Sequence, residues 1–319
     1  MIRFLIALLG VAAIVAPVQA QTWPAKPIRL IVPFPPGGGT DFVARQLATE
    51  LGKSSGWTIV VENKAGASGM LGLAEAAKGS PDGYDMVLGQ ADNLVIAPAL
   101  QKAPINPLND LTPVSLVATS AFLFMSSGNS KYKTLNEAIS AAKASPNTVT
   151  YGTAGAGTFA GLAMVLLEKE GGFDMKEVPY KGATPAITDL LGGHIDLAAL
   201  SIASGMAHIP AGKVRGLAVT SPQRSSALPD VPTVQELGYK GFEANHFLGI
   251  LVPNGVPPAV ISRLNAEIGK ALQSPELKKA MLGQGVEARH STPETFSAMM
   301  KSETDKWHGI IRAAGIKAE

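Results

Sequence analysis

Two segments of this chain combine a strand-like run, a glycine-rich loop and the start of a helix. Residues 28–45 read IRLIVPFPPGGGTDFVAR, and residues 149–158 read VTYGTAGAGT before apolar residues at helical spacing. A glycine loop that opens a helix leaves backbone N–H groups unpaired, and the helix dipole favours negative charge there. Two such loops predict a small anion held between two lobes. The alternative for each loop is a glycine turn needed only for tight packing of strand against helix.

Strand-like and helical runs alternate along the chain, which is typical of an α/β fold with a mainly parallel sheet flanked by helices. Helices are expected over residues 40–53, with Thr40 as a cap, and from Pro258, Pro275 and Pro293 onwards. The expected strands are residues 28–32, 58–61, 85–88, 116–118, 148–151, 195–200 and 214–220.

The length of 319 residues exceeds what one core usually organises, so two lobes are expected. Because no low-complexity linker separates two halves, we expect the chain to cross between the lobes twice, near residues 119–126 and 240–250. The predicted first lobe is then residues 21–121 and 246–319, and the second is residues 122–245. Paired crossings of this kind act as stiff hinges, which predicts closure of the lobes as the main motion.

The N-terminus has the pattern of a cleavable signal peptide, residues 1–20. Arg3 supplies the positive start, residues 4–15 are apolar, and Val18-Gln19-Ala20 is a small-x-small cleavage pattern. The apolar run is too short to cross a bilayer of about 30 Å, and no later segment is apolar enough, so no membrane insertion is expected. The absence of cysteine excludes disulfides, cysteine metal sites and a lipid-modified N-terminal cysteine.

Charge and motif content exclude several classes of function. With 27 basic and 25 acidic residues the chain lacks the electrostatic footprint of a nucleic-acid binder. The five histidines form no His-x-x-x-His pair, and no Gly-x-Ser-x-Gly elbow is present. Ser140-Ala-Ala-Lys143 matches a penicillin-binding motif but lacks a Lys-Thr-Gly partner. We therefore expect neither a metal nor a catalytic centre.

The second glycine loop also satisfies a loose dinucleotide fingerprint, Gly155-Ala-Gly157-Thr-Phe-Ala160. That fingerprint needs an acidic residue at the end of the next strand, about 20 positions on, to meet a ribose hydroxyl. The strand near residues 178–180 contains Pro179 and is followed by Lys181. No dinucleotide, and no other cofactor, is therefore expected.

Four polar residues outside the glycine runs have two interpretations. Asp41 stands in the first turn of a helix, as a helix-start acid or as a ligand contact. Ser68 belongs to a third glycine loop, residues 66–69, which is also compatible with a plain connection. Asp92 and Asn93 follow a strand where doubly wound sheets place ligands, although a solvated loop fits them equally well.

Several motifs, in their order along the chain, resemble one known family. They are Val32-Pro-Phe-Pro-Pro-Gly-Gly-Gly-Thr-Asp41, Pro81-Asp-Gly-Tyr84, Tyr151-Gly-Thr-Ala-Gly155, Val178-Pro-Tyr-Lys-Gly182 and Leu228-Pro-Asp-Val-Pro-Thr233. The set is similar to the periplasmic substrate-binding proteins of tripartite tricarboxylate transporters, also called the Bug receptors. The resemblance covers essentially the whole chain after the signal peptide.

This resemblance implies a two-lobed, flytrap-like periplasmic receptor without enzymatic activity. It implies capture of a small mono-, di- or tricarboxylate, held largely by backbone amides and ordered water, and delivery to inner-membrane transporter subunits. A monomer located in a Gram-negative periplasm is expected. The alternatives from other classes are an exported serine hydrolase and a sensor subunit that presents its ligand to a membrane kinase.

The candidate ligand-binding residues follow from the motif positions and the polar residues above. They are Phe34, Pro35, Gly37, Gly38, Gly39, Thr40, Asp41, Ser68, Asp92, Asn93, Gly152, Thr153, Ala154, Gly155, Gly157, Thr158 and Ser201. The chain departs from the family pattern at Gly161, where members often carry histidine, and at His246-Phe247, where they often carry tryptophan. Both changes alter side-chain bulk near the expected cleft.

Overall fold

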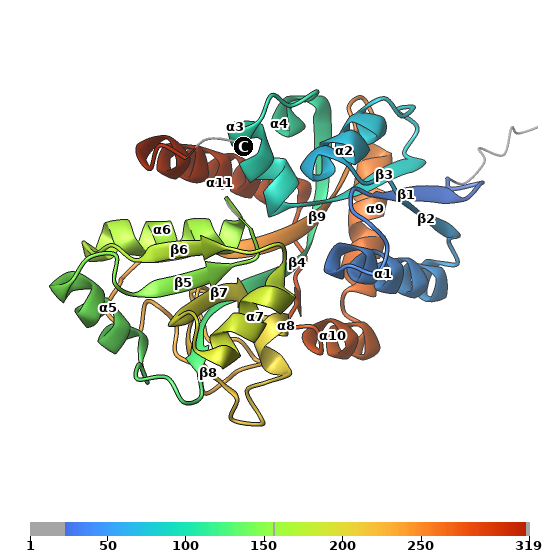
Figure 1. The fold of residues 1–319 in the computed structure, drawn as a ribbon. Helices are drawn as coiled ribbons and strands as arrows, with labels where there is room; N and C mark the ends of the chain where they lie inside the picture. Colours follow the sequence, from blue (N-terminus) through green and yellow to red (C-terminus); the bar gives the residue numbers. More distant parts are fainter. Residues whose placement is uncertain (1–22, 156, 317–319) are drawn as a thin grey trace, which may run out of the picture.

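The computed structural model describes residues 23–155 and 157–316, so the predicted signal peptide lies outside the described residues (Figure 1). The chain begins with β1 (Ile28–Val32), α1 (Gly39–Ser55), β2 (Ile59–Asn63), η1 (Ala67–Gly69), α2 (Met70–Ala77), β3 (Asp85–Gln90), η2 (Asp92–Ile96), α3 (Ala97–Leu100) and α4 (Pro107–Asp110). The middle part comprises β4 (Leu111–Ser127), α5 (Leu135–Ala144), β5 (Thr150–Thr153), α6 (Phe159–Gly171), β6 (Lys176–Pro179), α7 (Ala183–Gly192), β7 (Leu197–Ser201), α8 (Ile202–Met206) and β8 (Val214–Val219). The chain ends with β9 (Asn245–Pro253), α9 (Pro258–Ala271), α10 (Pro275–Leu282), β10 (Glu287–Ala288) and α11 (Pro293–Ala313).

The strands form one continuous sheet in the order β2-β1-β3-β9-β4-β7-β5-β6, with β10 and β8 also paired with β4. The pairs of β1 with β2 and β3, and of β5 with β6 and β7, are parallel. Every pair that includes β4 or β9 is antiparallel. The predicted α/β fold with two lobes is confirmed. The sheet is more mixed than expected because the chain leaves the first lobe along β4 and returns along β9.

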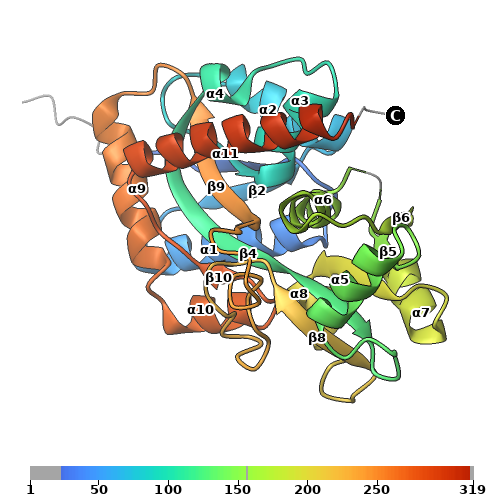
Figure 2. The ribbon, with the colours of Figure 1, turned by 90° about the vertical axis from the view of Figure 1, so that its left-hand side faces the viewer.

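Strands β4 and β9 connect the two lobes (Figures 1 and 2). β4 pairs with β9 from Leu111 to Ala121, and from Phe122 onwards it pairs with β7 and β8 of the second lobe. The predicted lobe boundaries fall beside Ala121 and its partner Asn245, at the point where these pairings change. The crossings are therefore hydrogen-bonded strands, and the division into lobes at those residues stays a prediction.

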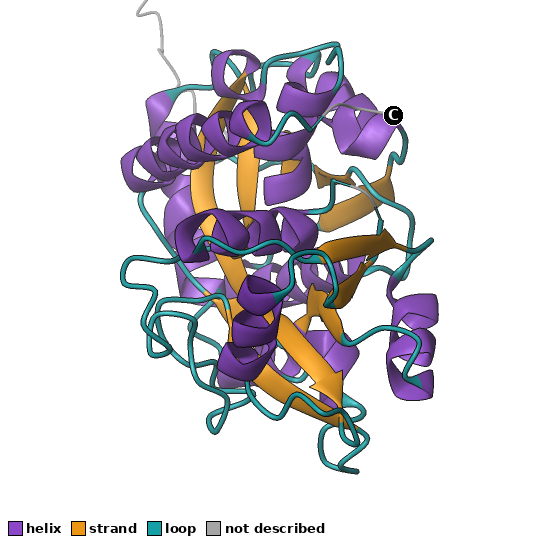
Figure 3. Ribbon diagram, turned by 60° about the vertical axis from the view of Figure 1, so that its left-hand side comes forward, coloured by secondary structure: helices purple, strands orange, loops and turns teal. Residues whose placement is uncertain are grey.

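Helices cover the sheet on both faces (Figure 3). In the first lobe α1 packs against α9 and α10, so the C-terminal helices return beside the N-terminal ones. Helix α1 buries Val43, Leu47 and Leu51 on one stripe, as the helical spacing predicts. The side chains of Ser274 and Thr292 cap α10 and α11 by accepting hydrogen bonds from the backbone three residues on. These caps, each followed by proline, fix the helix starts predicted from sequence.

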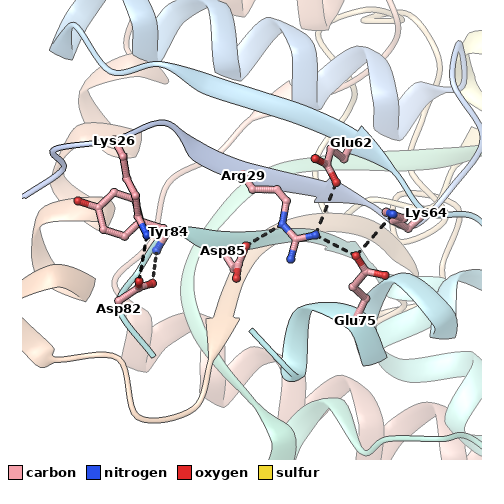
Figure 4. Close-up of polar contacts among 8 residues, drawn as sticks. All are labelled: Lys26, Arg29, Glu62, Lys64, Glu75, Asp82, Tyr84 and Asp85. Atoms are coloured by element: carbon pink, nitrogen blue, oxygen red, sulfur yellow. Dashed lines mark hydrogen bonds and ion pairs between the residues drawn. The ribbon is translucent and has the colours of Figure 1, made fainter. Parts of the chain in front are cut away.

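The first three strands carry an ion-pair network centred on Arg29 (Figure 4). Its guanidinium donates to Asp85 Oδ1 at 2.7 Å and to Glu75 Oε1 at 2.9 Å, and it lies 3.5 Å from Glu62 Oε2. The hydrogen bond to Asp85 is the main reason that the pKa of Arg29 is raised. The network joins β1 to β2, α2 and β3. Lys64 also belongs to it, because its Nζ lies 3.6 Å from Glu75 Oε1.

The first glycine loop is held in place by Asp41 at the start of α1. One carboxylate oxygen of Asp41 accepts hydrogen bonds from Gly37 N and Arg45 Nε, both at 2.9 Å. The other oxygen accepts from Asn63 Nδ2, which also donates to Phe34 O. These donors, Arg45 first, lower the pKa of Asp41 to about 2 even though the side chain is buried. Asp41 therefore fixes the shape of the loop from inside the lobe.

A buried threonine braces the crossing between the lobes. The hydroxyl of Thr220 accepts a hydrogen bond from Phe122 N at 2.8 Å and donates to Ala244 O at 2.7 Å. Thr220 itself is fully buried. The single side chain therefore links β4, where it enters the second lobe, to the segment that leads into β9.

The Asp41 network predicts a specific pH dependence of stability. Because the folded pKa of about 2 lies below the ordinary value of 3.8, the ionised carboxylate stabilises the fold above about pH 4 and loses this effect as the pH falls through 2. We expect the difference in free energy of unfolding between wild type and Asp41→Asn to shrink by about 2 kcal/mol between about pH 4 and 2. Urea titrations at a series of pH values measure it. The exposed Asp230→Asn is the control, and parallel curves for wild type and Asp41→Asn would contradict the expectation.

The two hydrogen bonds of the Thr220 hydroxyl predict that an isosteric variant without this hydroxyl is less stable. Thr220→Val removes the hydroxyl and leaves Phe122 N and Ala244 O without it, which costs about 1–3 kcal/mol of unfolding free energy. Thr188→Val makes the same change at an exposed position of α7 and should stay within about 0.5 kcal/mol of wild type. Denaturant unfolding compares the two. Equal losses would show that Thr220 contributes no more than a surface threonine.

Candidate functional site

A cleft of about 770 Å³ lies between the two lobes, and we call it the glycine-loop compartment. The first lobe supplies residues 34–40, which include the glycine loop, and residues 284–286. The crossing strands supply Ser120 and Phe122 from β4 and His246 and Leu248 from β9. The second lobe supplies residues 201–203, where β7 ends and α8 begins. The compartment is therefore built from both lobes and from the strands that join them.

A second cavity of about 430 Å³, which we call the α6 compartment, lies beside the start of α6. Its lining includes Ser68 from η1, Gly157 and Thr158 from the second glycine loop, and Glu177 from β6. Asp92 lines both compartments. Among the described residues, the two glycine loops therefore line two compartments that share Asp92, and neither compartment is lined by both loops.

The lobes touch on both sides of this cleft. A Cβ atom at Gly285 would lie 2.8 Å from Ile202 Cγ2, so the first lobe packs closely on α8 there. A Cβ atom at Gly157 would lie 3.3 Å from Leu100 Cδ1 on the other side. Ser226 also donates from its hydroxyl to Glu287 Oε1 at 3.0 Å. These contacts describe an arrangement in which the lobes are close together.

The first glycine loop presents backbone donors to the glycine-loop compartment. The N-cap of α1 is Gly38 and not the expected Thr40, which lies inside the first turn, and no side chain caps this helix. Gly37 N is bound by Asp41, whereas the N–H groups of Gly38, Gly39 and Thr40 have no acceptor among residues 23–155 and 157–316. Residues 35–39 are exposed along the cleft. The loop can therefore give several N–H groups to an anion at a helix N-terminus.

The second glycine loop is engaged mainly within its own lobe. Thr153 is fully buried, and its hydroxyl donates to Glu177 Oε1 at 2.7 Å. Ala154 O accepts from Gly182 N, and Gly155 O accepts from Thr158 N. Thr158 caps α6 by accepting from Gly161 N at 3.4 Å. Of the described residues of this loop, Gly157 and Thr158 line the α6 compartment.

The predicted site residues fall into three groups. Those that line the glycine-loop compartment are Phe34, Pro35, Gly37, Gly38, Gly39, Thr40, Asp92 and Ser201. Those that line the α6 compartment are Ser68, Gly157 and Thr158, together with Asp92. Those that line neither are Asp41, Asn93, Gly152, Thr153, Ala154 and Gly155. Within the last group Asn93 is buried and accepts from Gln90 N through Oδ1, so it shapes the turn after β3.

A side-chain network in the lining of the glycine-loop compartment was not predicted as a unit. Thr40 donates to Gln90 Oε1 at 2.5 Å, Gln90 Nε2 lies 3.4 Å from Asp92 Oδ2, and His246 Nε2 lies 2.9 Å from the same oxygen. The network runs from α1 through the end of β3 to β9. Gln90 could have been suspected from its place at a strand end, whereas its link to His246 depends on the pairing of β3 with β9.

Aromatic side chains fix the position of His246. Its ring makes edge contacts with Phe122 at 6.1 Å and Phe159 at 6.4 Å between centroids. Phe159 in turn packs on Trp307 of α11 at 4.6 Å. The imidazole therefore stands on a rigid apolar base formed by β4, α6 and the C-terminal helix.

A third cavity of about 450 Å³ contains arginine, but its arginines are already paired. Arg224 Nε donates to the carboxylate of Glu236 at 2.9 Å, and Arg289 donates to Glu287 at 2.8 Å. These ion pairs reduce the positive charge available to a ligand. The glycine-loop compartment, whose N–H groups are unoccupied by protein acceptors, is the stronger candidate for an anion.

Neither a metal cluster nor a membrane-crossing helix is found in the part of the chain that the structure describes. No three His, Asp or Glu side chains in residues 23–155 and 157–316 gather closely enough to hold a metal ion. No helix in those ranges combines the length and apolar character needed to cross a bilayer.

Comparison with known proteins finds relatives of this chain both by sequence and by structure. The family model described as the tripartite tricarboxylate transporter family receptor matches residues 43–316. Protein BugT of Bordetella pertussis is 37% identical over 322 residues, which cover 98% of each chain. The structure of R. palustris Rpa4515 with adipate is 28% identical with a TM-score of 0.78, and covers 93% of this chain and 100% of that one. MatC (Rpa3494) from Rhodopseudomonas palustris with bound malate is 28% identical with a TM-score of 0.73, over 91% and 100% of the two chains.

The family model and BugT each extend over most of the sequence, so the resemblance drawn from its motifs is confirmed. Members of this family are substrate-binding receptors and not enzymes, which sets aside the hydrolase alternative. The chain belongs to the tripartite tricarboxylate transporter receptor family, the Bug receptors.

Proposed function

We propose that this receptor captures a small organic carboxylate between its lobes in the periplasm and delivers it to an inner-membrane permease. The observation that carries the proposal is the start of α1, which has no side-chain cap: residues 38–40 line the glycine-loop compartment, and their N–H groups have no acceptor among the described residues. We further propose that the protein acts as a monomer whose signal peptide, residues 1–20, is removed on export.

The charge of the cleft supports binding through the backbone. The described residues that line the two compartments include no lysine or arginine. An anion must therefore be neutralised by N–H groups and the dipole of α1. Charge-assisted hydrogen bonds of about 1.5–3 kcal/mol each make this feasible without a salt bridge.

Two related structures support the ligand class. Their names record adipate and malate, which are both carboxylates. We propose that the carboxylate of the ligand lies on the first glycine loop and that the rest of the molecule extends past Asp92 towards Gly157 and Thr158. This path would use both glycine loops even though they line different compartments.

Closure of the lobes is the motion that we propose for capture. Lobe 1 would comprise residues 21–121 and 246–319 and lobe 2 residues 122–245, with β4 and β9 as the hinge. A ligand that contacts both lobes binds the closed arrangement better and therefore shifts the population towards it.

A comparison of acid and amide tests the anion site. A cognate carboxylate at about one hundred times its Kd should add roughly 2.7 kcal/mol to the free energy of unfolding, whereas its amide should add nothing measurable. The reason is that only the anion uses the field at the start of α1. Thermal melting against a panel of mono-, di- and tricarboxylates finds the ligand, and small-angle scattering then measures compaction. Equal melting shifts from acid and amide would rule out the anion mechanism, and a shift without compaction would rule out closure.

A glycine variant tests the first loop directly. Gly38 has extended backbone angles and only Pro35 O near its Cβ position, at 3.7 Å, so Gly38→Val fits the fold at a cost of about 1 kcal/mol for the weaker cap. Its side chain would stand among the N–H groups that face the cleft, so binding should fall by more than about a hundredfold.

The control is Gly309→Val in α11, where a Cβ meets nothing within 4 Å and the residue lies outside both compartments. It should bind like wild type in calorimetric titration. Normal binding by folded Gly38→Val would remove the role assigned to this loop.

A further inference from the structure

We propose that Asp92 determines which carboxylates bind. In this proposal the cleft selects a carboxylate that carries a hydroxyl or ammonium donor near Asp92 and rejects one that places a second carboxylate there. The inference rests on the proposed function, because it assumes that one carboxylate of the ligand lies on the first glycine loop.

Asp92 occupies a central position in the cleft. It is the first residue of η2, separated by one residue from the end of β3 at Gln90, and it lines both compartments. Its side chain is 35% exposed, so it can be reached from the cleft. A ligand that extends from the first glycine loop towards Gly157 must therefore pass this carboxylate.

Asp92 presents an open acceptor oxygen at this point. Asp92 Oδ2 receives His246 Nε2 at 2.9 Å and has Gln90 Nε2 at 3.4 Å, whereas Oδ1 has no donor among residues 23–155 and 157–316. An ionised carboxylate accepts hydrogen bonds and donates none. Because the carboxylate cannot donate, His246 Nε2 is the donor to Oδ2, and Oδ1 is left as an open acceptor.

The surroundings reinforce this preference. Glu177 places a second carboxylate in the lining of the α6 compartment, where its Oε1 accepts from Thr153 and a Cβ at Gly161 would lie 3.1 Å from that oxygen. The described lining holds no lysine or arginine to offset these charges. The cleft therefore offers donors at the glycine loop and acceptors at Asp92 and Glu177.

A matching ligand has the opposite polarity. A hydroxyl or ammonium group near Asp92 can donate to the open Oδ1, whereas a second carboxylate brings like charge and leaves Oδ1 and the facing ligand oxygen without a donor. An unmet polar group in a partly buried site lowers affinity by about tenfold or more.

Matched ligands of four and six carbons test the inference. The six-carbon series is hexanoate, 6-hydroxyhexanoate, 6-aminohexanoate and adipate, and the four-carbon series is butyrate, 4-hydroxybutyrate, 4-aminobutyrate and succinate. Calorimetric titration of the wild-type protein should give tighter binding for the hydroxy and amino acids than for the diacid, by about tenfold or more in the series that fits.

Two variants and a control assign the effect to Asp92. Asp92→Asn offers an amide that can donate, so the preference should shrink to less than about threefold through tighter binding of the diacid. His246→Gln keeps a donor to Asp92 and should retain the wild-type preference. The exposed Asp230→Asn makes the same chemical change away from the cleft and should leave every affinity unchanged.

The possible outcomes distinguish a failure of this inference from a failure of the proposed function on which it rests. If the diacid binds wild type as tightly as the hydroxy acid, or if Asp92→Asn keeps the preference, the role of Asp92 is overturned and carboxylate capture stands. If no carboxylate of either series or of the wider panel binds, the proposed function fails and this inference fails with it.

Discussion

The antiparallel pairing of β4 with β9 is the constraint on which this structure depends. It joins the strands of both lobes into one sheet, so neither lobe is attached by a flexible linker. Its register shifts between Pro113 and Ser115 and between Leu116 and Ala118, and such irregularities are places where a sheet can bend and twist. The same strands contribute Phe122 and His246 to the cleft. A bound molecule would therefore rest on the element that couples the lobes.

The charge arrangement of the cleft differs from a conventional salt-bridge site. The arginines near the hinge are held by Glu236 and Glu287, and the cleft is lined by backbone N–H groups, aromatic rings and carboxylates. Backbone donors at a helix start are fixed in direction and need no side chain to be ordered on binding. Asp41 supports them from inside the lobe through Gly37 and Asn63, so its carboxylate acts as a structural support behind the loop.

Local signals in the sequence predicted much of the fold. β1 was located to the residue because a mainly apolar run bounded by proline is typical of a buried strand, and Pro258, Pro275 and Pro293 marked helix starts correctly. β9 was expected only as a crossing, and just a short part of β4 was expected as a strand. Serines, glycine and proline interrupt their apolar pattern, and their stability comes from partners far away in the chain.

The site was harder to predict for the same reason. The first glycine loop carries its own signal, because helix start and glycine run are contiguous in sequence. Nothing local brings residues 284–286 beside residues 201–203, or His246 beside Asp92. Such contacts depend on how β9 returns beside β3. Sequence indicated the components of the cleft, and the topology of the sheet decided which of them meet.

The close approach at Gly285 has a consequence for how the cleft operates. Its backbone has φ +66, and a Cβ there would press on Ile202 of the opposite lobe. Because glycine carries only a hydrogen atom there, the two lobes can come into close contact at this point. A larger side chain at this position would hold the two lobes further apart. If the lobes close on a ligand as proposed, the size of this one residue limits how closely they can approach here, and it therefore affects how readily the ligand exchanges with solvent.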